Sequence, residues 1–353
     1  MRIQLRYVAA SLAMLMFAPG LFAGNEDRAG SAGAGYLLVN PWARSTGTAG
    51  ALMARAEGVE SAYLNIAGMN FINKTEVAFT QTMYLQGTGI NINALGLAQR
   101  INESSVLGLT VTNWNFGRIE RTTTELPEGD GSFFSPNVLV IGAHYSRAFS
   151  NSIYGGITVN ILNESTAEIR STGVAFDAGI KYVTGENDRV KIGITLKNVG
   201  PEMTYQGDGL SFQGQDPLIG TTLTVEHRSA RNELPSLVAL GGTYDFLLGA
   251  NHRLTPGFTF IANSFTKDNF LVGLEYGFRE LFILRGGYHY ETGITNDADR
   301  MTVLTGPHAG LSVKAPLGKG GSNISFDYSY RFTSPFGGIH AIGIVMGLGG
   351  SQD

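Results

Sequence analysis

The side chains that most often carry out chemistry are few in this sequence. It has six histidines and no cysteine, so a thiol nucleophile, a disulfide framework and a thiolate metal site are excluded. His144, His289 and His308 are expected on a polar face where serine and aspartate are also frequent, and residue types alone leave a Ser-His-Asp arrangement open. No nucleophile elbow or similar local motif accompanies them. The sequence therefore favours a protein that is not an enzyme.

Two loops contain residues that could hold an ion. Asp297 and Asp299, with Asn296, offer the oxygen ligands that Ca²⁺ takes, but their spacing matches no complete calcium loop. Lys319 in "LGKGGS" follows a glycine, but the spacing of a phosphate-binding loop and its helix are missing. Solvated loops are the favoured interpretation of both, and we expect neither a metal nor a cofactor.

The composition indicates the kind of element that must position these residues. Charged residues make up 15% of the chain, against a usual share of about 25%. Glycine is abundant, with 48 residues in 353, which is typical of β structure with many turns. The formal net charge is −4, so neither nucleic acid nor an anionic lipid surface is an expected partner.

The first 23 residues have the pattern of a secretory signal peptide. Arg2 and Arg6 precede an apolar run over residues 7–17, and small residues lead to a cleavage site expected after Ala23. The run is shorter than the roughly 18 residues of a spanning helix, and Pro19 and Gly20 interrupt it. Removal of this segment would take the net charge to −6, because it contains two arginines and no acidic residue.

Most of the remaining chain alternates apolar and polar residues with a period of two. In "NISFDYSYRF", Ile324, Phe326 and Tyr328 share one face, and Ser325 and Asp327 share the other. The same division recurs in residues 173–182, 190–197 and 269–277. This period is that of a β-strand with two different faces.

About fourteen such strands are predicted, most of them ten residues or longer. Membrane-spanning strands need about 9–11 residues, whereas strands of soluble proteins average about 5–6. The expected strands are residues 74–84, 87–100, 104–123, 135–149, 152–163, 169–184, 189–199, 234–247, 252–264, 267–278, 281–292, 305–316, 321–333 and 337–348.

Ionisable residues lie on one face of these strands. A soluble sandwich or lipocalin-like barrel turns its apolar face inward, and burying the charged face in a dry core would be very costly unless all of its charges were paired. A membrane barrel instead turns the apolar face to lipid and the polar face to the lumen. The residues expected to face the lumen are Asp177, Lys181, Lys191, Lys197, Glu275, Arg285, His289, Lys314, Asp327 and Arg331. The predicted fold is an all-β, transmembrane antiparallel barrel.

The connections between the strands support the same fold. The long ones follow the third, seventh and eleventh predicted strands, whereas those after even-numbered strands are short. Outer-membrane barrels have short periplasmic turns and longer extracellular loops. The longest connection, residues 200–233, contains two alternating stretches that predict a small hairpin outside the membrane. Partner recognition is the favoured role of this loop, and a passive cover over the pore is the alternative.

A different segment precedes the first strand. Residues 24–35 are expected to form a flexible leader. Residues 36–72 contain too much alanine and glycine for a strand, and "TAGALMARAEGV" (residues 48–59) predicts a short helix. A segment of this size could fill the lumen of a barrel of about fourteen strands.

The sequence "ARSTGTAGALMARAEGVESAYLNIAGM" (residues 43–69) resembles the N-terminal signature of the PorV/PorQ-like outer-membrane proteins, which are similar in fold to the FadL transporters. Ala49, Leu64 and Ile66 depart from the signature. The matching residues are Ala43, Arg44, Gly47, Gly50, Ala51, Asn65, Ala67 and Gly68.

The resemblance implies a fourteen-stranded outer-membrane barrel whose N-terminal segment is folded inside as a hatch. It also implies a non-enzymatic role in type IX protein secretion, in which outer loops dock secreted cargo or secretion partners. A FadL-like transporter of a hydrophobic ligand is the alternative, and a soluble exported β protein is a third. The expected organisation is a signal peptide (1–23), a leader and hatch (24–72) and a barrel (73–353) in contact with outer-membrane lipid.

Overall fold

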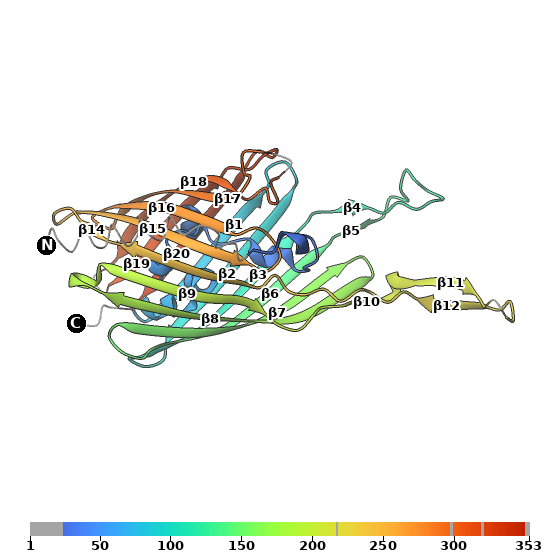
Figure 1. The fold of residues 1–353 in the computed structure, drawn as a ribbon, viewed down its shortest axis with the longest axis horizontal. Helices are drawn as coiled ribbons and strands as arrows, with labels where there is room; N and C mark the ends of the chain where they lie inside the picture. Colours follow the sequence, from blue (N-terminus) through green and yellow to red (C-terminus); the bar gives the residue numbers. More distant parts are fainter. Residues whose placement is uncertain (1–23, 217, 297–298, 319–320, 350–353) are drawn as a thin grey trace.

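The computed structural model of the protein describes residues 24–216, 218–296, 299–318 and 321–349. The expected signal peptide lies outside these residues. Fourteen long strands pair antiparallel in one closed ring (Figure 1). The ring closes where the first strand, β1, pairs with the last strand, β20. Within the described residues, no helix is long and apolar enough to cross a membrane.

The barrel strands follow the predicted segments closely, and the predicted fold class is confirmed. In order around the ring they are β1 (Thr75–Tyr84), β2 (Ile90–Arg100), β3 (Ser105–Asn115), β6 (Asn137–Ala148), β7 (Ile153–Thr166), β8 (Ile169–Thr184), β9 (Val190–Val199), β13 (Leu237–Tyr244), β15 (His252–Asn263), β16 (Asn269–Phe278), β17 (Phe282–Glu291), β18 (Gly306–Leu317), β19 (Ser322–Arg331) and β20 (Ile339–Leu348).

The third predicted strand, residues 104–123, was too long. The strand β3 ends at Asn115, whose side-chain oxygen accepts a hydrogen bond from the Gly117 N–H at 2.8 Å. Gly117 has a φ of 80°, a conformation that glycine adopts readily and that turns the chain out of the sheet. Beyond it, the short strands β4 (Ile119–Glu120) and β5 (Phe133–Phe134) form a separate hairpin.

The two ends of the barrel differ in the length of their connections. We call one the short-turn end; its connections are residues 101–104, 149–152, 185–189, 245–251, 279–281 and 318–321. The opposite, long-loop end carries the long connections 116–136, 200–236 and 292–305, and four short ones, residues 85–89, 167–168, 264–268 and 332–338. The short strand β14 (Phe246–Leu247) pairs with β15, and the 3-10 turn η5 (Glu186–Asp188) lies in a short turn.

The longest loop contains its own small elements. The strand β10 (Tyr205–Gln206) extends the sheet beside β8, and the turn η6 (Asp208–Leu210) follows it. The strands β11 (Ser211–Gln215) and β12 (Thr222–Glu226) pair as a hairpin, as the alternation predicted. Figure 1 shows this hairpin and the β4–β5 hairpin extending beyond the barrel wall at the same end.

The strands expose apolar side chains on their outer face. Leu109, Val272 and Phe326 are 51–56% exposed, although they lie in the middle of strands. Their neighbours in sequence point inward and are mostly small or polar. A lipid bilayer removes the cost of exposing such a face to water, so the alternation fits a barrel that spans a membrane.

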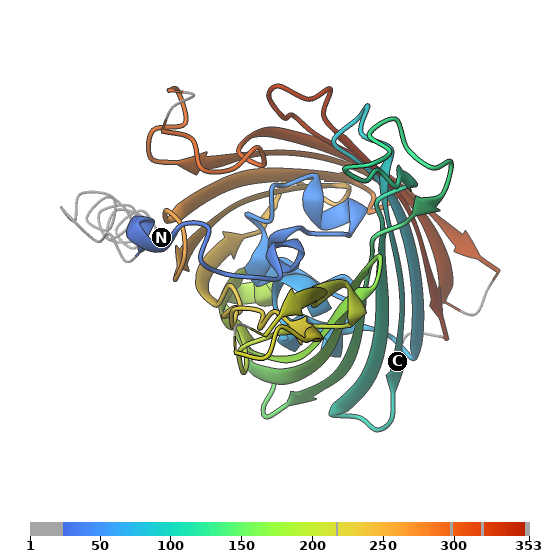
Figure 2. The same ribbon diagram turned by 90° about the vertical axis from the view of Figure 1, so that its right-hand side faces the viewer.

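The N-terminal segment lies inside the barrel as a hatch (Figure 2). It is built of short turns: η2 (Gly35–Leu38), α2 (Ala43–Thr46), η3 (Met53–Arg55), α3 (Ser61–Leu64) and η4 (Ile66–Phe71). The predicted helix over residues 48–59 is therefore wrong. Ala49 and Gly50 have φ values of 58° and 80°, which interrupt helical geometry before η3 begins.

The leader is held against the rim of the long-loop end, in contrast to the flexible tail that was expected. Its first turn is η1 (Glu26–Arg28). The Arg28 guanidinium forms an ion pair with Glu233 at 2.5 Å and lies 4.2 Å from the centre of the Phe265 ring. The Gly33 N–H donates to the Glu233 carbonyl at 2.9 Å. The leader therefore contacts the base of the longest loop.

Glycines on the inner face of the strands allow the hatch to lie directly against the wall. A β-carbon at Gly96 would lie 2.3 Å from Val59, and one at Gly257 would lie 2.2 Å from Leu52. Neither distance is possible without displacing the hatch. These glycines therefore allow hatch side chains to pack directly on the backbone of the wall, and they do not serve turns.

Gly68 offers a direct test of how tightly the hatch is folded. A β-carbon there would lie 2.0 Å from the Ala56 carbonyl oxygen and 2.9 Å from the Ser61 β-carbon. Gly68→Val is expected to loosen the hatch and raise single-channel conductance in planar bilayers. Gly35→Val is the matched control, because a β-carbon at Gly35 would meet nothing within 4 Å. Unchanged conductance in Gly68→Val, with the barrel still heat-modifiable on gels, would contradict this account.

Candidate functional site

An ion pair joins the first hatch helix to the barrel wall. Arg44, in α2, lies with its Nη2 3.2 Å from Oδ2 of Asp327, in the middle of β19. The Asp327 side chain is fully buried, and its other oxygen accepts hydrogen bonds from the Ser312 and Ser325 hydroxyls. The carboxylate is therefore fully hydrogen-bonded, which is the condition under which a buried charge is tolerated.

A second group of charges holds the η3 turn. The Arg55 Nε lies 3.3 Å from Asp245 Oδ1 and 3.8 Å from Glu275 Oε1. Glu275 also accepts hydrogen bonds from Arg253 at 2.9 Å and from Arg285 at 2.6 Å. The Glu275 carboxylate of the wall thus contacts three arginines, one of which belongs to the hatch.

Two wall lysines bind the hatch backbone. Lys181 Nζ donates to the Ala56 carbonyl at 3.1 Å and lies 4.0 Å from the centre of the Phe71 ring. Lys197 Nζ donates to the Tyr63 carbonyl at 2.5 Å and lies 3.5 Å from the centre of the same residue's ring. These contacts combine charge-assisted hydrogen bonds with cation–π attraction.

Asp177 has a different role, in the wall itself. The pairing of β8 with β9 shifts register between Phe176 and Ala178. At this bulge the Asp177 carboxylate accepts a hydrogen bond from the Asn198 N–H at 2.7 Å. The bulge leaves the Asn198 N–H without a partner on the neighbouring strand, and the Asp177 side chain supplies one.

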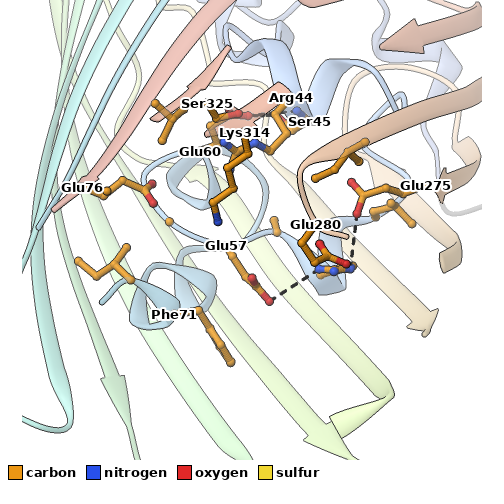
Figure 3. A pocket seen from close by; sticks show the side chains of 18 of the residues that line it. Arg44, Ser45, Glu57, Glu60, Phe71, Glu76, Glu275, Glu280, Lys314 and Ser325 are labelled. Atoms are coloured by element: carbon orange, nitrogen blue, oxygen red, sulfur yellow. Dashed lines mark hydrogen bonds and ion pairs between the residues drawn. The ribbon is translucent and has the colours of Figure 1, made fainter. Parts of the chain in front are cut away.

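The structure places the predicted lumen-facing residues as follows. His289 and Lys314 are half-buried, and Lys314 points into the space between Glu57 and Glu60 (Figure 3). The remaining eight are at most 7% exposed: Asp177, Lys181, Lys191, Lys197, Glu275, Arg285, Asp327 and Arg331. Lys191 forms an ion pair with Asp245 at 2.7 Å.

The predicted hatch residues lie where the hatch meets the wall or turns on itself. Asn65 Nδ2 donates to the Ile180 carbonyl at 3.0 Å, and its Oδ1 accepts from the Ala67 N–H at 3.1 Å. A β-carbon at Gly47 would lie 2.9 Å from the Gly310 Cα. The remaining members, Arg44, Gly50 and Gly68, are described above.

Sequence reasoning missed several members of the charged network, among them Arg55, Glu60, Asp245 and Arg253. Arg253 lies an even number of residues from Thr255 and Thr259, which also point inward. The alternation of this strand could therefore have predicted that Arg253 faces the lumen. Asp245 lies inside the predicted strand 234–247 and shares the inward parity of Leu237 and Thr243, so alternation pointed to it as well. Arg55 and Glu60 lie in the hatch, whose irregular turns have no period.

Small cavities remain between the hatch and the wall, and three of them have charged residues in their lining. The first, about 240 Å³, lies toward the short-turn end, where Arg44, Lys314, Glu57, Glu76 and Glu280 face one another (Figure 3). The other two have volumes of about 60 and 90 Å³. The described lumen is therefore divided into small spaces by the hatch.

Two of the three histidines named as possible catalytic groups, His144 and His308, have other hydrogen-bond partners. His144 lies between the hydroxyls of Thr110 and Thr158, at 2.8 and 2.9 Å. His308 Nδ1 donates to the Thr46 carbonyl at 2.9 Å. At the possible calcium loop, Asn296 Nδ2 donates to Asp299 at 2.6 Å, and Asp297 lies outside the described residues.

The β11–β12 hairpin presents apolar side chains to solvent. At its tip Leu218 is 92% exposed and Ile219 is 73% exposed. The tip is ordered by its own hydrogen bonds, because the Asp216 carboxylate accepts from the Leu218 N–H at 2.8 Å and the Asp216 carbonyl from the Gly220 N–H at 2.9 Å. Contiguous exposed apolar surface, in contrast to single exposed residues, often marks an interaction site.

The base of this loop packs on the start of the hatch. Leu37 of the hatch lies in a buried cluster with Met203 and Leu234, which flank the hairpin, and with Leu162 of the wall. Met203 and Asn232 exchange two backbone hydrogen bonds of 2.8 Å, which hold the two arms of the loop together. The hatch and the hairpin are therefore in direct physical contact.

The Arg44–Asp327 pair generates a stability prediction. Asp327→Asn leaves Arg44 without its counter-ion and should lower the free energy of unfolding by roughly 2–3 kcal/mol. Breaking a fully buried pair costs roughly 3–5 kcal/mol. The loss is smaller here because the Arg44 side chain is 29% exposed. Urea unfolding in detergent measures this. Glu168→Gln breaks the exposed pair with Arg121 and should cost at most about 1 kcal/mol. Equal losses in the two variants would show that the Arg44 pair contributes no more than a surface pair.

Glu60 makes the stability of the hatch depend on pH. Burial raises the pKa of Glu60 to about 7, against the opposing attraction of Arg44. Because the folded-state pKa lies above the unfolded one, the protonated carboxyl stabilises the fold fully below about pH 4.5, and this contribution is lost as pH rises through 7. Urea midpoints should therefore fall between pH 5 and pH 8, and the fall should be smaller in Glu60→Gln. An identical fall in both proteins would assign the effect to other groups.

The comparisons with known proteins agree with this architecture. The family model described as type IX secretion system protein PorV matches residues 22–264, which contain the hatch and the barrel strands from β1 to β15. No curated protein sequence matches the chain.

Solved structures show the same fold at low sequence identity. The chain is similar to the CymD monoaromatic hydrocarbon channel, with a TM-score of 0.53 and 11% identity over 87% of this chain and 95% of that chain. It is also similar to the P. putida toluene transporter TodX, with a TM-score of 0.50 and 12% identity over 84% and 95%. A Pseudomonas aeruginosa FadL homologue aligns with a TM-score of 0.48 and 14% identity over 86% and 96%.

At these identities, the likeness to solved structures establishes the fold alone. The family match covers more than half of the chain and includes the segment whose signature the sequence resembles. The chain belongs to the PorV family of type IX secretion system proteins.

Proposed function

We propose that this PorV-family barrel acts without catalysis in protein secretion, by docking a secreted protein or a secretion partner on the β11–β12 hairpin. The observation that carries the proposal is the pair of apolar side chains at the hairpin tip, Leu218 and Ile219, exposed by 92% and 73%. Exposed anchors held on a rigid scaffold are the usual basis of a protein-binding site.

The shape of the hairpin suits a protein partner. Phe212, Leu223 and Val225 add further apolar surface, each 40–46% exposed. An isolated two-stranded hairpin is only marginally stable in water, and neither edge of this one pairs with another strand among the described residues. A partner that adds a strand to an edge would satisfy both backbone and side chains.

The charge of the loops restricts the kind of partner. Residues 200–236 contain five acidic and two basic residues, and residues 116–136 contain four acidic and two basic residues. Complementary charge increases association rates and excludes unsuitable partners. We therefore expect a partner whose contact surface has apolar pockets with basic residues around them.

The filled lumen supports docking over transport. Sites for small molecules usually have volumes of about 300–1,000 Å³, whereas the cavities described above have volumes of about 240, 60 and 90 Å³. A FadL-like transport role, the second candidate, would require the hatch to move and its ion pairs to break.

The proposal includes an orientation in the outer membrane. Barrels of this class place long loops outside the cell and short turns in the periplasm. The long-loop end would then face the exterior, where a secreted protein is captured, after cleavage of the N-terminal signal peptide.

Substitution of the hairpin tip tests the proposal. Leu218→Asp with Ile219→Asp removes both apolar anchors and adds negative charge, and should reduce recovery of secreted proteins and secretion components in a membrane pull-down by at least about tenfold, as expected for the loss of hot-spot residues. Mass spectrometry of the recovered proteins measures the change. The barrel should remain heat-modifiable, because the tip contacts no barrel strand.

Leu126→Asp is the matched control. Leu126 is 52% exposed in the β3–β6 connection, beside the other projecting hairpin. An equal loss of partners from Leu126→Asp would remove the assignment to β11–β12. Full retention by the double variant at the tip would count against docking by this hairpin.

A further inference from the structure

The 90 Å³ cavity differs from the larger one in the sign of its charge. It lies under Leu304 of the β17–β18 loop, between the hatch and the wall. Two basic residues, Lys197 and Arg331, line it, and none of the described residues that line it is acidic. By contrast, arginines and glutamates face one another across the 240 Å³ cavity. The smaller cavity therefore has a net positive lining.

Neither cation forms an ion pair with a carboxylate of the described residues, although Asp177 lines the adjacent 60 Å³ cavity together with Lys197. Lys197 and Arg331 are 7% and 6% exposed, and no carboxylate of the described chain lies within 4.0 Å of either charge. Lys197 donates to the Tyr63 carbonyl and lies over the Tyr63 ring, whereas the Arg331 Nε is buried without a hydrogen-bond partner. A buried guanidinium without a counter-ion is costly, by several kcal/mol in general.

Further unsatisfied polar atoms lie at the same place. His308 and Arg331 are opposite one another on β18 and β19, and the rings of His289 and His308 are 6.5 Å apart. The Nε2 atoms of both histidines are buried without hydrogen-bond partners. Since buried polar groups are normally paired, four unpaired or partly paired groups around one cavity indicate an occupant.

The rest of the lining limits what that occupant can be. Met53, Leu64, Leu237, Ile261 and Leu271 supply an apolar wall. The planar guanidinium matches a carboxylate in geometry as well as charge, and the apolar wall suits a short alkyl group. The volume is below the 150 Å³ of an engineered cavity known to bind benzene, so the alkyl group must be short.

We infer that this cavity is a binding site for a short-chain monocarboxylate, whose carboxylate lies between Arg331 and Lys197 and whose alkyl group lies against the apolar wall. Bound there, the anion would neutralise the positive lining and fix the hatch, through Lys197 and Tyr63, to the wall. The inference does not depend on cargo docking, and it is tested on the purified barrel without any partner.

Titration of the purified full-length barrel in detergent tests the site. Sodium butyrate is added at constant ionic strength, with sodium gluconate as the balancing salt because gluconate is too large and polar for the cavity. The midpoint temperature of heat modification should rise saturably with butyrate, because a ligand that binds the folded state stabilises it. Isothermal calorimetry should give one site per barrel. The absence of saturable binding would overturn the inference.

Two variants and one control locate the site. Arg331→Met should weaken butyrate binding at least about tenfold, the lower limit for losing a hydrogen bond to a charged group, and should leave the barrel at least as stable as the parent in gluconate. Ala239→Leu fills the cavity from β13 while keeping both cations, and should also abolish binding. Arg147→Met, at an exposed outer position of β6, should bind butyrate normally.

Two further results would contradict a carboxylate site in this cavity. Undiminished binding in both Arg331→Met and Ala239→Leu would place butyrate elsewhere and overturn the assignment. Sodium bromide distinguishes the chemistry of the anion: stabilisation by bromide equal to that by butyrate would identify a general halide site instead of a carboxylate site. Stabilisation by butyrate alone supports the inference.

Discussion

The closed ring of hydrogen bonds between the strands is the constraint on which the rest of this structure depends. Hydrocarbon offers no partner for a backbone N–H or C=O, so a sheet can cross it only if no edge remains. Closure is completed where β1, the first strand, meets β20, the last. The pairing of β8 with β9 contains a bulge, and there the Asp177 side chain takes the place of a backbone acceptor. Once the ring is closed, each strand must have one face in lipid and one in the lumen.

The hatch fills the space that the closed ring leaves inside the barrel. A ring of fourteen strands encloses more space than its own inward side chains fill, and many of those side chains are charged. The hatch approaches the wall closely at inward glycines such as Gly96 and Gly257. Arg44 and Arg55 of the hatch pair with wall carboxylates, and hatch carbonyls accept hydrogen bonds from wall lysines. Burial and ion pairing therefore occur in the same interface, and each depends on the other.

The hatch contacts the base of the loop that is proposed to dock a partner. Leu37 joins Met203 and Leu234 in one buried cluster, and Arg28 joins the leader to Glu233. The hairpin tip is thus carried on a base that the hatch helps to hold in place, while the exposed anchors remain free to meet a partner. A rigid base under a projecting apolar tip favours recognition, since little order has to be created on binding.

The sequence by itself determined the strands, the side of each that meets lipid, the long-loop end and the family. These are local properties: a period of two residues, the cost of charge in lipid and a short signature can all be read along the chain. The third strand was predicted too long because its terminating turn depends on one side chain, Asn115. Only the tertiary structure decided the path of the hatch, the partners of Arg55 and Asp245, and the isolation of Arg331 from acidic side chains. Those features arise when distant segments meet inside the closed ring, and irregular turns carry no period that would show where they meet.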